Sequence, residues 1–237
     1  MTIYGDGKVT YTDAESLSGD LGEKVRGGDK EALQKLRKFA EILDPEQPHS
    51  QARALYELSE VYFKGLCDVE KSPEEALKFL IRAAELNDDL ALIRLGKFYR
   101  DGEHFEINGK KALELFAKAS DCGNKAGLIL SAEIYRHGQA DIAADGYKAV
   151  EFYEKLDAID DKMALMNIAQ IYATGCGQLK PDKYTALEIY NDIIRHGKYW
   201  AEVQRRFKIS SNRKVIYDMA LNCANQIYNK DMGGVKI

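Results

Sequence analysis

The sequence contains no long apolar run. No stretch approaches the about 20 consecutive apolar residues that a membrane-spanning helix needs. Its start, MTIYGDGKVTY, has neither the cationic residues nor the apolar centre of a secretory signal. These absences argue against membrane insertion, and we expect a cytoplasmic location.

Cysteine and histidine are scarce, with four of each in 237 residues. The cysteines form no CxxC pair, and no cysteine and histidine pair has the spacing of a zinc site. We therefore expect four free thiols and no metal ligands. The residues concerned are Cys67, Cys122, Cys176 and Cys223, and His49, His104, His137 and His196.

The patterns of an active site are also missing. No GxxxxGK[ST] or GxGxxG run is present to hold phosphates, and no pattern pairs a nucleophile with a base. The acidic residues fall where helix caps and solvated faces need them. We predict a non-enzymatic protein with no catalytic residues and no cofactor, and hydrolase activity of the purified protein would contradict this.

An internal repeat is the dominant feature that is present. The pair Tyr-x-x-Gly recurs four times in steps of 37, 36 and 37 residues. Such even spacing indicates an array of helix pairs rather than a single globular core. The four copies are Tyr62/Gly65, Tyr99/Gly102, Tyr135/Gly138 and Tyr172/Gly175.

Each copy predicts two helices. The first, helix A, has small residues eight and three positions before the tyrosine and an apolar face around them. We expect the glycine to end helix A, and the tyrosine to pack between the paired helices with its hydroxyl near the loop. Helix B begins after a capping residue in each copy. The predicted caps are Ser72, Asn108, Asp145 and Asp182, and the predicted ends of helix B are Asn87, Gly123, Gly197 and, more weakly, Asp160.

This pattern resembles the Sel-one-like repeat family, whose members are tetratricopeptide-like α/α solenoids. A small residue, Leu95-Gly96, the Tyr-x-x-Gly turn, a variable loop and an alanine-aromatic second helix carry the resemblance. It implies an all-α fold, a right-handed α/α solenoid of about four helix pairs with atypical helical caps at both ends. The chain departs from the secreted, cysteine-rich branch, which pairs two cysteines within each repeat.

The resemblance and the flanking sequences predict four segments. Residues 1–28 are expected to be irregular, with a hairpin around Gly5 to Lys8 or a short helix as alternatives. Residues 29–50 are expected to form a capping helix, residues 51–197 the repeats, and residues 198–237 a helical cap. Atypical end units are expected because stacked repeats leave an apolar face open at each end.

We interpret the chain as a protein-interaction scaffold or adaptor that binds a protein or peptide. The main alternative is a bacterial immunity or chaperone-like protein that binds and neutralises a cognate effector or toxin. A second alternative is nucleic-acid binding through RRFKISSNRK, residues 205–214, which has five basic residues. The net charge of −4 combines a body, residues 1–194, with 35 acidic and 25 basic residues, and a tail from Arg195 with three acidic and nine basic ones, so the body would repel a polyanion. The basic tail and acidic body would allow head-to-tail contact, so we expect a monomer or a weak homo-oligomer.

By analogy with tetratricopeptide geometry, the positions six before, two before and one after each tyrosine face the concave surface. Polar residues there are the better candidates for partner contact, because the apolar first position has repeat-to-repeat packing as an alternative. Arg100 and Arg136 are predicted to hold an acidic side chain or a terminal carboxylate together. The predicted partner-binding residues are Tyr56, Glu60, Phe63, Ile93, Lys97, Arg100, Ile129, Glu133, Arg136, Met166 and Gln170, with Ala173 as the last equivalent position.

Overall fold

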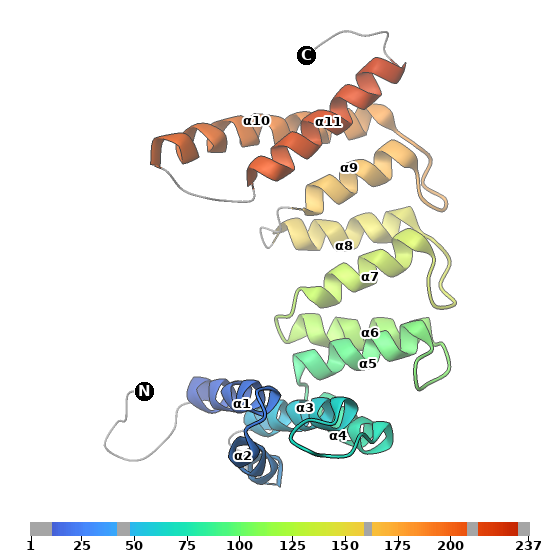
Figure 1. The fold of residues 1–237 in the computed structure, drawn as a ribbon. Helices are drawn as coiled ribbons and strands as arrows, with labels where there is room; N and C mark the ends of the chain where they lie inside the picture. The colour runs from blue at the N-terminus through green and yellow to red at the C-terminus, as the bar shows by residue number, and fades with distance from the viewer. Residues whose placement is uncertain (1–10, 42–47, 159–162, 208–212, 232–237) are drawn as a thin grey trace. The chain divides into compact units, whose positions relative to one another are not determined.

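The fold of the computed structural model is all-α (Figure 1). The structure describes residues 11–41, 48–158, 163–207 and 213–231, and within these ranges it has eleven helices and no strand. The chain divides into two compact units. Unit 1 comprises residues 1–106 and 111–127, and unit 2 comprises residues 107–110 and 128–237.

Unit 1 holds α1 to α5 and most of α6. In it α3 packs against α1, α2 and α4, and α4 packs against α5. The bounds are α1 Tyr11–Arg26, α2 Lys30–Glu41, α3 Pro48–Lys64, α4 Pro73–Glu85, α5 Asp89–Asp101 and α6 Gly109–Asp121.

Unit 2 holds most of α7 and the helices that follow it. Helix α9 packs against α8 and α10, and α10 packs against α11. The bounds are α7 Ala126–His137, α8 Gly146–Ala158, α9 Ala164–Thr174, α10 Lys183–Phe207 and α11 Arg213–Asp231. Helices α3, α5, α7 and α9 are the A helices of the four predicted repeats, and α4, α6, α8 and α10 are their B helices.

The predicted caps of three B helices are confirmed. The Ser72 hydroxyl accepts a hydrogen bond from the Glu75 N–H at 3.3 Å, with Pro73 in the first turn. The Asp145 and Asp182 carboxylates each accept from the amides two and three positions further on, in α8 and α10. At the start of α6, next to the predicted cap Asn108, the Gly109 N–H donates to the Asp141 carboxylate at 2.6 Å.

The predicted helix ends are mostly confirmed. The glycine of every Tyr-x-x-Gly turn has a positive φ, between +66° and +74°, where a side chain would strain the backbone. Asn87 and Gly123 also have positive φ, at +61° and +86°. Asp160 lies outside the described residues. The prediction for Gly197 is wrong, because α10 continues through it to Phe207.

Two of the repeated tyrosines stack on an aromatic ring of the paired helix, as predicted, whereas Tyr99 stacks on Phe105 of the following loop, with ring centroids 4.6 Å apart. Tyr62 stacks on Phe79 with ring centroids 5.4 Å apart, and Tyr135 stacks on Phe152 at 5.8 Å. The backbone adds a contact that the pattern did not predict, because the tyrosine carbonyl accepts from the N–H of the next cap. The pairs are Ser72 to Tyr62 at 3.1 Å, Asp145 to Tyr135 at 2.7 Å and Asp182 to Tyr172 at 2.7 Å.

The two ends of the chain differ from the predicted segments. Residues 1–28 were expected to be irregular, but α1 occupies Tyr11–Arg26 and packs on α2 and α3. The predicted capping helix 29–50 is shorter, since α2 ends at Glu41 and α3 begins at Pro48. The boundary between 197 and 198 falls within α10. The hairpin considered around Gly5 to Lys8 lies outside the described residues.

Candidate partner-binding surface

The predicted partner-binding positions form what we call the A-helix face: the residues six before, two before and one after each repeated tyrosine. In unit 1 they lie on α3 and α5. These residues are Tyr56, Glu60 and Phe63 on α3, and Ile93, Lys97 and Arg100 on α5. In unit 2 they are Ile129, Glu133 and Arg136 on α7, and Met166, Gln170 and Ala173 on α9.

Arg94 links α3 and α5 across the A-helix face of unit 1. It forms an ion pair with the buried Glu60 carboxylate, which also lies 2.5 Å from the Lys64 ammonium. The Arg94 guanidinium lies over the Phe63 ring, 4.4 Å from its centroid. Burial lowers the pKa of Arg94. The charge is thus held in place by a carboxylate and an aromatic ring.

His104, which follows α5, packs beside these rings. Its imidazole centroid lies 5.7 Å from that of Phe63 and 4.9 Å from that of Phe98, and its φ is +66°. Tyr56 is half-buried, and that burial raises the pKa of its hydroxyl. Neither Arg94 nor His104 recurs at its position in the other repeats, so the repeat pattern did not predict them as part of the surface. The available signal was an arginine within the apolar stretch LALIRLG of α5.

The other α5 residues of the face differ in exposure. Ile93 is buried, which supports the alternative of packing for the apolar first position, whereas Lys97 is exposed. The Arg100 guanidinium forks onto its neighbour Asp101, with Nε to Oδ1 at 2.7 Å and Nη2 to Oδ2 at 2.9 Å. These hydrogen bonds hold the pKa of Asp101 below its ordinary value.

In unit 2 the face is tied together by Arg136. Its guanidinium donates to Asn167 Oδ1 at 3.0 Å and to Gln170 Oε1 at 2.8 Å, so α7 is bonded to α9. Gln170 is exposed, whereas Met166 is buried in a cluster with Tyr190. Ile129 and Glu133 are half-buried.

Among the predicted residues, Glu60 and Phe63 are thus linked through Arg94, and Arg136 is bonded to Gln170; the partner-binding role of the face remains a prediction. Arg100 belongs to unit 1 and Arg136 to unit 2. Their joint hold on one carboxylate remains a prediction.

A second polar cluster in unit 1 was not predicted. Arg53 of α3 reaches the residues that start α5, with Nε 2.8 Å from Asp88 Oδ2 and Nη2 2.6 Å from Asp89 Oδ1. Asn124 donates to the other Asp89 oxygen at 2.6 Å. Burial raises the pKa of Asp88, although Arg53 opposes this. A nearby pair joins Arg26 of α1 to Glu57 of α3 at 2.5 Å.

Other predicted features concern metals, thiols and nucleic acid. Over the residues that the structure describes, no group of three or more histidine, cysteine or acidic side chains could hold a metal ion. Within the same ranges no helix combines the length and apolar character needed to cross a membrane.

The four cysteines are free thiols. The side chains of the basic run 205–214 lie outside what the structure describes, so nucleic-acid binding stays untested.

Comparison with known proteins decides the family. The Sel1 repeat profile matches residues 52–88, 89–124, 127–156 and 162–191, more than half of the chain. The chain belongs to the Sel1 repeat family. Sel1 repeats generally serve as protein-interaction scaffolds. No curated protein sequence matches the chain.

Two solved structures share the fold. A Sel1 repeat protein from Oxalobacter formigenes superposes with a TM-score of 0.59 at 19% identity, covering 92% of this chain and 76% of that one. A protective antigen of uropathogenic Escherichia coli strains with an SLR fold gives 0.58 at 17% identity, covering 97% of this chain. This Sel1 protein spans 54% of the length of that antigen.

Proposed function

We propose that this Sel1 protein is a non-enzymatic adaptor that binds a protein or peptide partner through its A-helix face. One observation carries the proposal: in unit 1 that face combines the half-buried aromatic rings of Tyr56 and Phe63 with the cations of Arg94, Lys97 and Arg100. Tyrosine and arginine are enriched among the residues that dominate binding energy.

The unit 1 face is organised before any partner arrives. Arg94 is held by Glu60 and by the Phe63 ring, so little rotamer entropy remains to be lost on binding. The Arg100 and Asp101 pair is different, because Asp101 is exposed and such pairs contribute only about 0–1 kcal/mol. A partner carboxylate can therefore replace Asp101 at low cost. With Glu60 already neutralised, Lys97 and Arg100 favour an acidic group on the partner.

A crosslinking experiment tests the surface. A photoreactive amino acid replaces Lys97 on the A-helix face or, as a matched control, Lys118, an exposed lysine of helix B of the same repeat. After irradiation in cells of the native source, we expect a distinct crosslinked protein from position 97 that position 118 does not give. Identical products from both positions would contradict the proposal. The identity of the product also tests whether the partner is an effector or toxin, as an immunity role requires.

A double variant tests the arginines. Arg100→Ala with Arg136→Ala is expected to weaken binding of the crosslinked partner by more than about 1 kcal/mol, with at most a small fall in melting temperature from the lost Arg136 bonds to Asn167 and Gln170. Lys118→Ala with Arg195→Ala removes the same charge from two B helices and serves as the control. Normal binding by the first variant would move the site off this face, and its unfolding would show that the arginines are structural.

Sedimentation of the free protein tests whether it is a monomer or a weak homo-oligomer.

A further inference from the structure

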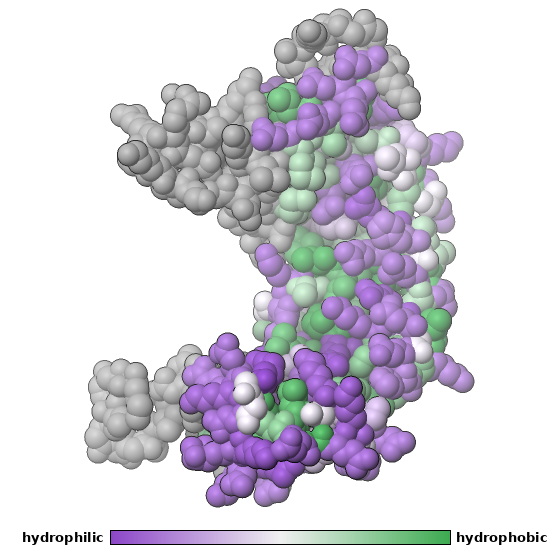
Figure 2. All heavy atoms as spheres, viewed as in Figure 1, coloured by the Kyte–Doolittle hydropathy of each residue, from purple (hydrophilic) through white to green (hydrophobic). Residues whose placement is uncertain are grey.

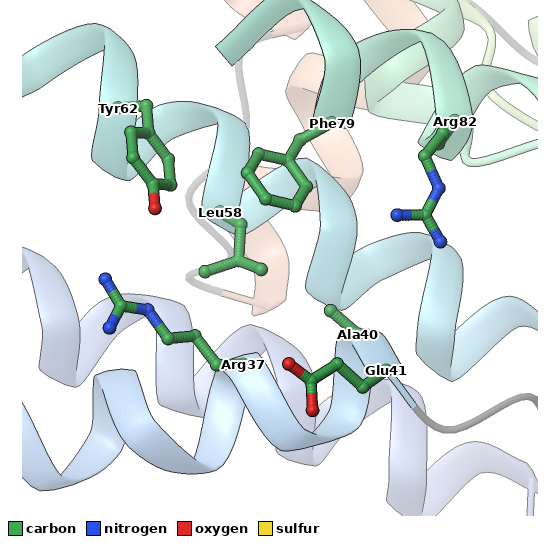
Figure 3. Close-up of a pocket in the computed structure, with 7 residues that line it drawn as sticks. All are labelled: Arg37, Ala40, Glu41, Leu58, Tyr62, Phe79 and Arg82. Atoms are coloured by element: carbon green, nitrogen blue, oxygen red, sulfur yellow. The ribbon is translucent and has the colours of Figure 1, made fainter. Parts of the chain in front are cut away.

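A pocket of about 380 Å³ lies in unit 1 where α2, α3 and α4 meet. Figure 2 shows a hydrophobic patch bordered by hydrophilic side chains over this part of the unit. The volume is within the range of about 300–1,000 Å³ that is usual for ligand sites. The pocket shares no residue with the A-helix face. Its lining residues are Arg37, Ala40, Glu41, Leu58, Tyr62, Phe79 and Arg82 (Figure 3).

The floor of the pocket is apolar. Leu58 and Ala40 are buried, and the Tyr62 and Phe79 rings stack with an interplanar angle of 22°. Both rings are half-buried, so the pocket exposes carbon surface to water. An apolar side chain placed over this floor would remove that surface from water, which is favourable.

The rim carries polar groups of complementary kinds. Arg37 and Arg82 lie on opposite sides of Leu58 and Phe79, the Tyr62 hydroxyl points to the side of Arg37, and the Glu41 carboxylate lies near Ala40 (Figure 3). Among the described residues, no hydrogen bond or ion pair engages the side chains of Arg37, Glu41 or Arg82. The rim thus offers donors at both ends, one acceptor, and a net charge of one positive unit.

We infer that this pocket binds the carboxy-terminal residue of a partner peptide that ends in an apolar side chain. Arg37 and the Tyr62 hydroxyl donate to the terminal carboxylate, since charge-assisted bonds to guanidinium are strong. The apolar side chain covers Leu58 and Phe79. Glu41 accepts the N–H of the last residue, and Arg82 donates to the preceding carbonyl.

The acceptor on the rim decides between sources of the carboxylate. A fatty acid supplies an apolar body and a carboxylate but no N–H for Glu41. A phosphate ester carries more negative charge, which Glu41 opposes. A peptide terminus offers a partner to every polar group on the rim, Glu41 included, and its single negative charge matches the net positive charge of the rim.

Titration calorimetry on the full chain tests the inference with three probes. They are N-acetyl-Gly-Ser-Gly-Leu with a free carboxylate, the same peptide as its terminal amide, and octanoate. The acid peptide is expected to bind about tenfold or more tightly than the amide, as one charge-assisted bond requires. Arg37→Gln should abolish this preference for the acid, whereas Arg82→Gln should weaken acid and amide by the same factor.

Lys38→Gln is the matched control, because Lys38 is exposed on α2 and does not line the pocket. Equal affinity for acid and amide would overturn the inference, as would an effect of Arg37→Gln no larger than that of Lys38→Gln. Octanoate binding as tightly as the peptide would reject the peptide assignment, and absence of binding by the acid peptide would reject the site. If Arg37→Gln fails to fold, Tyr62→Phe removes a donor but keeps the ring stack. The crosslinks at Lys97 do not depend on these outcomes, so this site and the A-helix face are tested separately.

Discussion

Replacing Arg53 by methionine is expected to destabilise unit 1 in a pH-dependent manner. Arg53 lies against Asp88, and their side chains are only 16% and 2% exposed. Methionine keeps most of the apolar stem but leaves the Asp88 charge buried without its cation. Removing one partner of a buried ion pair costs about 3–5 kcal/mol. We expect the lower end, about 3 kcal/mol at pH 7, because Asp88 still accepts from the Ala91 N–H at 2.8 Å.

The pH dependence separates charge burial from lost packing. Burial already raises the pKa of Asp88. At pH values above the ordinary carboxyl pKa, the folded state therefore binds more protons than the unfolded state. Stability contributed by protonated Asp88 is therefore lost as pH rises through the folded pKa. Without Arg53 the pKa of Asp88 rises further. One pKa unit corresponds to about 1.4 kcal/mol. We therefore expect Arg53→Met to lower the free energy of unfolding by at least about 1 kcal/mol less at pH 4 than at pH 7.

Urea denaturation followed by circular dichroism at both pH values measures the two losses, with hydrogen exchange of the α5 amides as a local probe. Arg53→Met with Asp88→Asn is the control, because asparagine still caps α5 but carries no charge. This double variant should recover much of the loss at pH 7 and show no extra pH dependence. Equal losses at both pH values, or no recovery with asparagine, would refute the reasoning.

Two further predictions concern single contacts. Arg100→Ala should raise the pKa of Asp101 towards its ordinary value, because the two hydrogen bonds from Arg100 are what lower it; an unchanged carboxyl titration by NMR would show that the fork does not form in solution. Gly96→Ala should cost about 1–3 kcal/mol from overpacking, because its Cβ would overlap the buried Phe116 ring, and the cost measured by urea denaturation should be smaller in a Phe116→Leu background.

The helical repeats could be predicted from sequence because their signals are local. A Tyr-x-x-Gly turn requires a left-handed residue, and Gly65 and Gly102 adopt it at φ of +69° and +73°. Cap residues such as Ser72 act on amides a few positions away. A period read from such signals therefore fixes the helix pairs and their order along the chain.

The errors arose where tertiary packing decides. Gly197 looked like a helix end, yet α10 continues through it, which is possible because a glycine inside a helix costs only about 1 kcal/mol. Residues 11–26 were grouped with the irregular start of the chain, yet they form α1, which packs on α2 and α3. Gly22 lies close to α3, since a Cβ there would overlap the Glu57 carboxylate and displace that side chain. A glycine required by a neighbouring helix cannot be distinguished from a turn by its own sequence.

The candidate surface was predictable only as a set of positions. Helical geometry placed Lys97 and Arg100 on one face, but it did not reveal that Arg100 pairs with Asp101. Arg94 was missed because its role depends on Glu60, 34 positions earlier and on another helix. Ion pairs between repeats depend on how adjacent helices are aligned, and the repeat pattern does not specify this.

The buried charges of unit 1 converge on one helix, α3. Glu57, Arg53 and Glu60 tie it to α1, to the start of α5 and to Arg94 in turn. Buried ion pairs are weak sources of stability but leave few alternative arrangements once their partners are fixed. The A-helix face and the α2 to α4 pocket both take residues from α3. Within unit 1 its ionic contacts therefore set the orientation of the pocket and of the α3 residues of the A-helix face, and a change that tilts α3 should alter binding at both even where neither is touched.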